Sequence, residues 1–177
     1  MSTDGMTHAP KGKPRPVCRD GEFIFAATHL DHGHIGGMIN GLTEAGGKLK
    51  WIYDTDPERA KPYLEANPGS KFVDSFDRVL EDSEVQLVAS AAVPVDRGPI
   101  GCQAMRAGKD YFTDKSPFTT LEQLEEAKKV QVETGMRYFV YFSERLHSEA
   151  GMYASQLVQD GVIGRVIQVL GLGPHRL

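Results

Sequence analysis

The chain has 177 residues, enough for one domain with a substantial hydrophobic core, or for one domain and part of a second. Its 20 basic and 24 acidic residues give a net charge of −4, so no basic excess is available to meet phosphates, and we expect no nucleic-acid partner. No apolar run approaches the roughly 18 residues of a membrane helix, and two cysteines are too few for a disulfide scaffold, so we expect a cytoplasmic protein with no membrane partner.

The first 20 residues differ in composition from the rest of the chain. They contain three prolines and four basic residues but almost nothing apolar. Such a segment cannot bury a hydrophobic face, so we predict that residues 1–20 form a disordered tail.

Short apolar runs alternate with helical patterns from residue 21 onward. Strands are predicted at residues 22–28, 49–53, 72–73, 85–92, 111–113 and 138–142. Helices are predicted between them, at residues 35–45, 57–66, 75–80, 98–107 and 121–134. Crossover helices require the strands to be parallel, and helices then cover both faces of the sheet. We therefore predict an α/β fold with a doubly wound parallel sheet, the Rossmann arrangement, over residues 21–145.

Two further elements follow the predicted sheet. Residues 148–160 have the pattern of a helix, which Gly161 ends, and residues 165–171 have the pattern of a strand. A lone strand has nothing to pair with, so it is either an extra edge strand of the same sheet or the start of another sheet. We prefer the second interpretation, in which residues 146–177 begin an incomplete α+β domain.

The loop after the first predicted strand, residues 28–37 (THLDHGHIGG), has two interpretations. In the first it is a degraded G-x-G-x-x-G motif, in which Asp31 replaces the first glycine. Gly33 lets the backbone approach a pyrophosphate, and Gly36 lets the helix pack tightly on the strand. The free N–H groups and partial positive charge of a helix N-terminus also favour an anion. The predicted cofactor contacts in this loop are His32, Gly33, His34 and Ile35.

An acidic residue supports the dinucleotide interpretation. Asp54 ends the second predicted strand, 21 residues after Gly33. An acid at that place can accept both hydroxyls of an adenosine ribose, and it repels a 2′-phosphate, which favours NAD over NADP. The alternative is a plain turn aspartate in the sequence Asp-Thr-Asp-Pro.

In the second interpretation of the loop, His29, Asp31, His32 and His34 are metal ligands. The segment superficially resembles the T-H-x-H-x-D-H-x-G-G loop of metallo-β-lactamase-fold hydrolases, but Asp31 stands where that motif needs a histidine. That fold also needs β-structure before the motif. We therefore expect no stoichiometric zinc, and a zinc-dependent hydrolase is a distant alternative. Solvated loop histidines are a third interpretation, for His29 above all.

Six segments carry a further pattern. Three of them are residues 53–60 (YDTDPERA), an acidic turn that opens a helix, residues 85–94 (VQLVASAAVP), a strand that ends in a proline-containing loop, and residues 107–115 (AGKDYFTDK). The others are residues 119–127, 142–145 and 161–166. In this order the segments resemble the N-terminal part of the Gfo/Idh/MocA oxidoreductases, the glucose–fructose oxidoreductase and inositol dehydrogenase group. The resemblance covers residues 21–177.

The resemblance implies an NAD(P)-dependent dehydrogenase that transfers hydride between a nicotinamide and a sugar- or polyol-like hydroxyl of a small molecule. Where the family has Glu-Lys-Pro, this chain has Asp for Glu and an inserted Ser, in the stretch from Asp114 to Pro117. The resemblance implies that Lys115 is catalytic and that Asp114 holds the cofactor ribose or orients Lys115. The further cofactor contacts it implies are Ala92, Pro94 and Arg97, which stands where the family often has His.

The family's Asp-x-x-x-His pair, whose His commonly serves as acid and base, is not seen in this sequence. The resemblance implies that the pair lies in the second domain, which lines the substrate pocket and mediates oligomerisation. We therefore expect a homo-oligomer if that domain is complete. The degenerate glycines leave a non-catalytic nucleotide-binding or regulatory module as the alternative function.

Overall fold

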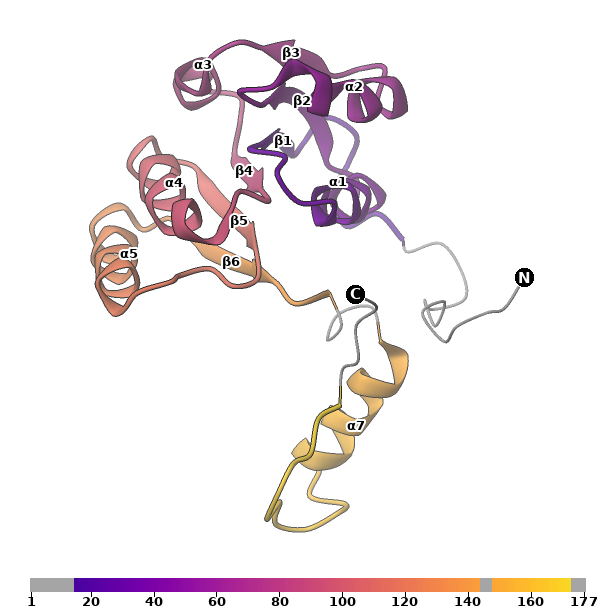
Figure 1. Cartoon of the computed structure of the whole chain (residues 1–177). Helices are drawn as coiled ribbons and strands as arrows, with labels where there is room; N and C mark the ends of the chain where they lie inside the picture. The colour runs from indigo at the N-terminus through magenta and orange to yellow at the C-terminus, as the bar shows by residue number, and fades with distance from the viewer. Residues whose placement is uncertain (1–14, 144–147, 173–177) are drawn as a thin grey trace. The chain divides into compact units, whose positions relative to one another are not determined.

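The computed structural model of the chain describes residues 15–143 and 148–172. The chain divides into two units, and the larger one, which ends at Tyr141, contains a six-stranded sheet (Figure 1). All its strands are parallel, and their order is β3-β2-β1-β4-β5-β6. This order confirms the predicted doubly wound sheet. The strands are β1 (Ile24–Thr28), β2 (Lys48–Tyr53), β3 (Lys71–Val73), β4 (Leu87–Ser90), β5 (Asp110–Asp114) and β6 (Tyr138–Tyr141).

Helices α1 to α5 connect the strands, and α7 belongs to the smaller unit. Their bounds are α1 (His34–Glu44), α2 (Pro57–Ala66), α3 (Phe76–Glu81), α4 (Pro94–Arg106), α5 (Leu121–Thr134) and α7 (Glu149–Gln159). Helix α4 begins at Pro94 rather than at residue 98, because proline fits the first position of a helix. Pro99 inside α4 has no N–H for the Val95 carbonyl, and Gln123 Nε2 of α5 donates to that carbonyl instead, at 2.8 Å.

Helices pack on both faces of the sheet, so the sheet separates two apolar layers. Along β1, Phe25 and Ala27 pack in the layer that contains residues of α1 and α2, whereas Ala26 packs in the layer that contains residues of α3, α4 and α5. All three of these β1 residues are completely buried. A strand that is buried on both faces has a continuous apolar sequence, which is the pattern that predicted it.

The smaller unit departs from its prediction. Residues 165–171 form no strand, and the described residues of this unit supply no neighbouring strand with which they could pair. Their apolar side chains are largely exposed, among them Ile167 at 88% and Leu170 at 80%. The predicted helix at residues 148–160 is present as α7.

The end of the predicted tail is bound to the larger unit. Residues 1–14 lie outside the described residues. The N–H groups of Val17 and Cys18 both donate to the carbonyl of Ala45, at 2.8 and 3.4 Å. Ala45 is the C-cap residue of α1, whose last carbonyls lack partners within the helix, so this stretch satisfies a helix end. The prediction of disorder is therefore wrong for these two residues.

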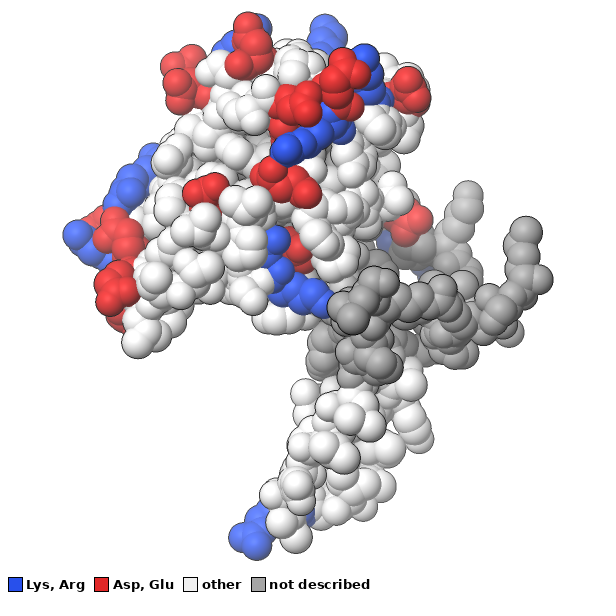
Figure 2. All heavy atoms as spheres, viewed as in Figure 1, with Lys and Arg blue, Asp and Glu red and all other residues white. Residues whose placement is uncertain are grey.

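Acidic and basic side chains are interspersed on the surface. Figure 2 shows many of them over the part of the larger unit where α2, α3 and β3 lie in Figure 1. Within the described residues, no helix combines the length and the apolar character that crossing a membrane requires.

Candidate functional site

The residues that the sequence singled out meet at the carboxyl edge of the sheet. They follow four strands that are neighbours in the order β2-β1-β4-β5. The strand order reverses between β1 and β4, and open α/β sheets bind ligands beyond the strand ends at such a point. His32–His34 follow β1, Asp54 follows β2, Ala92, Pro94 and Arg97 follow β4, and Asp114 and Lys115 stand at the end of β5.

The loop after β1 leads directly into α1. His32 N–H donates to the Ala91 carbonyl at 3.1 Å, which ties the loop to the end of β4. Gly33 is the N-cap of α1, and a Cβ added to Gly33 would meet no atom within 4 Å. The first N–H of the helix, that of His34, donates to His32 Nδ1 at 3.2 Å. Ile35 has a completely buried side chain in the core, so only its backbone lies at the helix N-terminus.

The close packing expected at Gly36 occurs one residue later. A Cβ on Gly36 would lie 3.5 Å from Tyr63 Cε1, an ordinary van der Waals distance. A Cβ on Gly37 would lie 2.8 Å from the hydroxyl of Tyr141, a side chain that is itself buried. The approach that requires glycine is therefore between α1 and β6, at Gly37.

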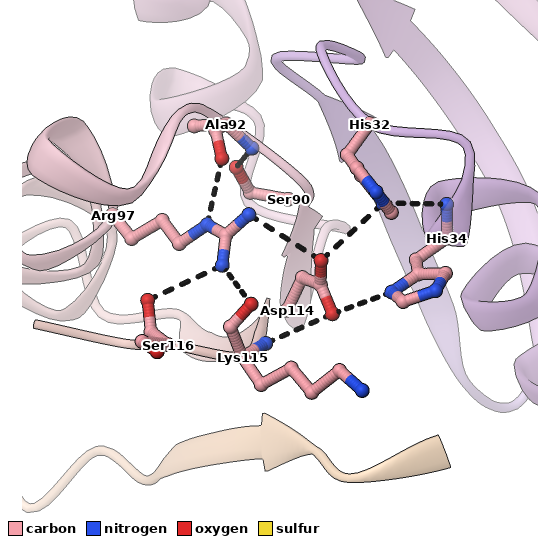
Figure 3. Close-up of polar contacts among 8 residues, drawn as sticks. All are labelled: His32, His34, Ser90, Ala92, Arg97, Asp114, Lys115 and Ser116. Atoms are coloured by element: carbon pink, nitrogen blue, oxygen red, sulfur yellow. Dashed lines mark hydrogen bonds and ion pairs between the residues drawn. The ribbon is translucent and has the colours of Figure 1, made fainter. Parts of the chain in front are cut away.

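Arg97 and Asp114 form a buried ion pair at the centre of the site (Figure 3). Their side chains are 4% and 2% exposed, and Arg97 Nη2 lies 3.3 Å from Asp114 Oδ2. The Arg97 guanidinium also donates to the carbonyls of Ala92, at 2.6 Å, of Ser116, at 3.2 Å, and of Lys115. Its donors are thus committed to protein groups, which explains how a charge can be buried there.

Both histidines of the loop contact the same carboxylate. His34 Nδ1 lies 2.9 Å from Asp114 Oδ1, and His32 Nδ1 lies 3.5 Å from Asp114 Oδ2. In sequence Asp114 is 80 residues from His34. The sequence predicts all three residues at the cofactor site but does not predict that they touch. Each of these three side chains offers one atom that could bind a metal ion, and these atoms lie within 4.8 Å of one another.

Lys115 follows the end of β5 and is half-buried. Its N–H donates to Asp114 Oδ1 at 2.8 Å, and its carbonyl accepts from Arg97. Figure 3 shows its side chain running away from the Arg97 guanidinium. The backbone of Lys115 is therefore held by both members of the buried ion pair.

Asp54 lies at the predicted place, but both of its carboxylate oxygens already accept hydrogen bonds from backbone N–H groups. Its side chain is 2% exposed, its Oδ2 accepts from Leu30 N–H at 2.6 Å, and its Oδ1 accepts from Asp56 N–H at 2.8 Å. These contacts are those of the turn aspartate, the alternative to a ribose contact. Each carboxylate oxygen keeps a second lone pair, which is what a ribose hydroxyl would use.

A cation that the sequence analysis missed lies beside this turn. Arg59 of α2 forms an ion pair with Asp31, the residue that replaces the first glycine of the motif, and its Nη1 lies 3.7 Å from Asp54 Oδ1. Hydrogen bonding to Asp31 and the nearby charge of Asp54 raise the pKa of the Arg59 guanidinium. Arg59 thus offsets the negative charge that Asp31 would present to a pyrophosphate.

His29 is a packed residue rather than a solvated one. Its ring meets Tyr53 and Phe76 edge-on, with centroids 5.3 and 4.9 Å away, and burial lowers the pKa of its imidazole. It also lies outside the cluster of candidate metal ligands. The interpretation of His29 as a solvated loop histidine is therefore wrong.

The sequence matches a known family over residues 29–142, the Gfo/Idh/MocA oxidoreductase family with an NAD-binding Rossmann fold. Among curated proteins, D-xylose dehydrogenase of Paenarthrobacter nicotinovorans is 26% identical over 113 residues, which are 64% of this chain and 29% of that protein.

Solved structures of oxidoreductases share the fold. A candidate oxidoreductase from Erwinia carotovora atroseptica SCRI1043 is 38% identical with a TM-score of 0.79, over 82% of this chain and 44% of that chain. The WlbA dehydrogenase from Chromobacterium violaceum, in complex with NADH and UDP-GlcNAcA, is 19% identical with a TM-score of 0.73, over 85% of this chain and 43% of that chain. The chain thus spans less than half the length of these relatives.

Proposed function

The chain belongs to the Gfo/Idh/MocA oxidoreductase family, whose Rossmann domain binds NAD, and from this we propose that it is the cofactor-binding part of an NAD-dependent dehydrogenase. The proposed reaction transfers hydride between the nicotinamide and a sugar- or polyol-like hydroxyl of a small molecule. The D-xylose dehydrogenase relative, and the UDP-GlcNAcA in the WlbA structure, support a substrate of this kind.

One observation carries the proposal, the glycine at the N-terminus of α1, at the point where the strand order reverses. Gly33 has no side chain there, and the first turn of α1 contains no acidic residue, although His34 N–H donates to His32 Nδ1. The partial positive charge of the helix end suits a pyrophosphate, and Gly33 leaves room for one. The residues present therefore fit the cofactor.

The first prediction concerns NADH binding by the 177-residue chain, measured by calorimetric titration. We expect saturable binding with one NADH per chain. Gly33→Val should weaken that binding about tenfold or more, because a branched side chain fills the space left for the pyrophosphate. Gly41→Ala, an exposed change in the same helix, should leave it unchanged. Equal affinity of the Gly33→Val variant and the parent chain would contradict the proposal.

In the proposed reaction the bound nicotinamide supplies the hydride chemistry. Lys115 extends from the end of β5, and we propose that its ammonium hydrogen-bonds the reacting oxygen. Asp114 accepts a hydrogen bond from the Lys115 N–H, and Arg97 donates one to the Lys115 carbonyl. We therefore assign Asp114 and Arg97 as positioning residues for Lys115. This assignment replaces the cofactor contact expected of Arg97, because its guanidinium is buried and engaged.

We also propose a preference for NAD over NADP. Three carboxylates lie near the end of β2, those of Asp31, Asp54 and Asp56. Within the described structure, the cation that pairs with all three is Arg59, so this group has a net negative charge. A 2′-phosphate on the adenosine ribose would bring further negative charge to this group.

The second prediction is that the chain binds NADH more tightly than NADPH, and that Asp54→Asn narrows the preference about tenfold. An amide keeps an acceptor for the loop N–H but removes the charge, and the size is that of one hydrogen bond to a charged group. The control is Glu125→Gln, which removes an exposed carboxylate of α5 that lies outside this group and should leave the preference unchanged. Calorimetric titration of both nucleotides measures the preference. Equal binding of NADH and NADPH by the parent chain would refute it.

A further inference from the structure

His32, His34 and Asp114 form a cluster of side chains that the proposed dinucleotide site does not explain. Two imidazoles and a carboxylate are a ligand set that divalent transition-metal ions prefer. The three come from two strand ends, since the histidines follow β1 and Asp114 ends β5. The sequence predicts no metal at the loop after β1, because that loop departs from the zinc-binding motif that it superficially resembles and because Asp114 lies far away in the chain.

The spacing of the ligand atoms suits one ion. An ion about 2.1 Å from each ligand atom holds neighbouring ligand atoms about 3–3.5 Å apart. His34 Nδ1 lies 2.9 Å and His32 Nδ1 lies 3.5 Å from the Asp114 carboxylate. The two imidazole rings lie edge to face, with centroids 4.2 Å apart, and their nitrogens come within 4.8 Å of one another. Two atoms about 2.1 Å from one ion lie at most about 4.2 Å apart, so the two imidazoles must approach each other for both to bind it.

The hydrogen bonds of His32 leave an unfavourable contact that a cation would remove. His32 Nδ1 accepts from the His34 N–H at 3.2 Å, so this nitrogen carries a lone pair rather than a proton. Asp114 Oδ2, 3.5 Å away, also carries only lone pairs. Arg97 contacts the same oxygen, but Figure 3 shows Arg97 and the histidines on opposite sides of the carboxylate. On the histidine side, Asp114 Oδ2 therefore faces the acceptor nitrogen of His32, whereas Asp114 Oδ1 lies at hydrogen-bond distance from His34 Nδ1.

The burial of the three groups indicates an open site rather than a closed one. The Asp114 side chain is 2% exposed, whereas those of His34 and His32 are 34% and 54% exposed. An ion held here has protein ligands on the inner side and open positions on the solvent side. Catalytic metal sites have this arrangement, with three protein ligands and a free position.

We propose that His32, His34 and Asp114 bind one divalent transition-metal ion at the carboxyl edge of the sheet. The proposal goes beyond the cofactor function and does not depend on it.

The test is calorimetric titration of the metal-free, tag-free chain with Zn²⁺ and with Co²⁺ alone, without NADH. We expect one ion per chain, and visible absorption bands when Co²⁺ is the ion bound. His32→Gln and His34→Gln should each weaken binding about tenfold or more, as the loss of a ligand does. The side chains of His32 and His34 lie partly in solvent, so these variants should fold, whereas Asp114→Asn would change a buried group that pairs with Arg97.

The control is Asp31→Asn, which removes a carboxylate from the same loop but from outside the cluster, since Asp31 pairs with Arg59. It should leave the metal affinity unchanged. Absence of saturable binding up to millimolar ion would overturn the proposal, and so would equal affinity in both histidine variants, which would indicate an adventitious ion only. NADH titration of the same samples keeps the two proposals separate: a chain that binds NADH but no ion refutes only the metal site.

Discussion

Replacement of Lys115 by alanine is expected to lower kcat of the proposed dehydrogenase about 10²–10³-fold, the effect of losing an electrostatic donor. A positive charge near the reacting hydroxyl acts most strongly when the oxygen becomes alkoxide-like, so it stabilises the transition state more than the bound substrate. The affinity for NADH should change little, because the α1 N-terminus and Gly33 remain. Steady-state turnover together with NADH titration measures both quantities.

Two comparisons separate an active-site role from a surface role. Lys115→Arg should restore little activity, because a planar guanidinium replaces a compact ammonium charge. Lys128→Ala, which removes an exposed lysine of α5 paired with Glu125, should leave kcat unchanged. Normal turnover of the Lys115→Ala enzyme would leave the non-catalytic nucleotide-binding module as the better proposal. Loss of NADH binding instead would move Lys115 into the cofactor site.

Replacement of Arg97 by methionine is expected to lower the free energy of unfolding of the larger unit by about 3–5 kcal/mol. The substitution keeps much of the side-chain volume but leaves the Asp114 carboxylate buried without its cation. It also removes the donor to the carbonyls of Ala92, Lys115 and Ser116. The cost of an uncompensated buried charge, rather than the intrinsic strength of the pair, sets this magnitude. Urea unfolding followed by circular dichroism gives the free energy.

The same helix provides the control for this prediction. Arg106 of α4 pairs with Glu126 of α5, and the two side chains are 51% and 44% exposed. Arg106→Met should cost no more than about 1 kcal/mol, because solvent screens an exposed pair. If the Arg97 and Arg106 variants lost equal free energy of unfolding, the buried pair of Arg97 and Asp114 would stabilise the fold no more than an exposed pair does.

The fold could be predicted from the sequence because its signals are local. The strands buried on both faces, β1 and β4, are continuous apolar runs, and proline marks the first turn of α2. Parallel order then follows from the helices between the strands. The same reasoning failed at residues 165–171, since an apolar run becomes a strand only beside a partner, and the described residues of that unit contain none.

The sequence by itself therefore determined the parallel sheet, and with it the edge at which the loop after β1, Asp54 and Lys115 lie. Only the tertiary structure decided what these residues touch. Asp114 meets His34 from 80 residues away, Arg97 turns inward to the same carboxylate, and Arg59 pairs with Asp31. Side-chain partners across an edge depend on strand order, helix start and rotamer together, whereas hydrophobic periodicity predicts only where strands and helices lie along the chain. Burial then decided their charge balance, because a carboxylate removed from water must find its partners within the fold.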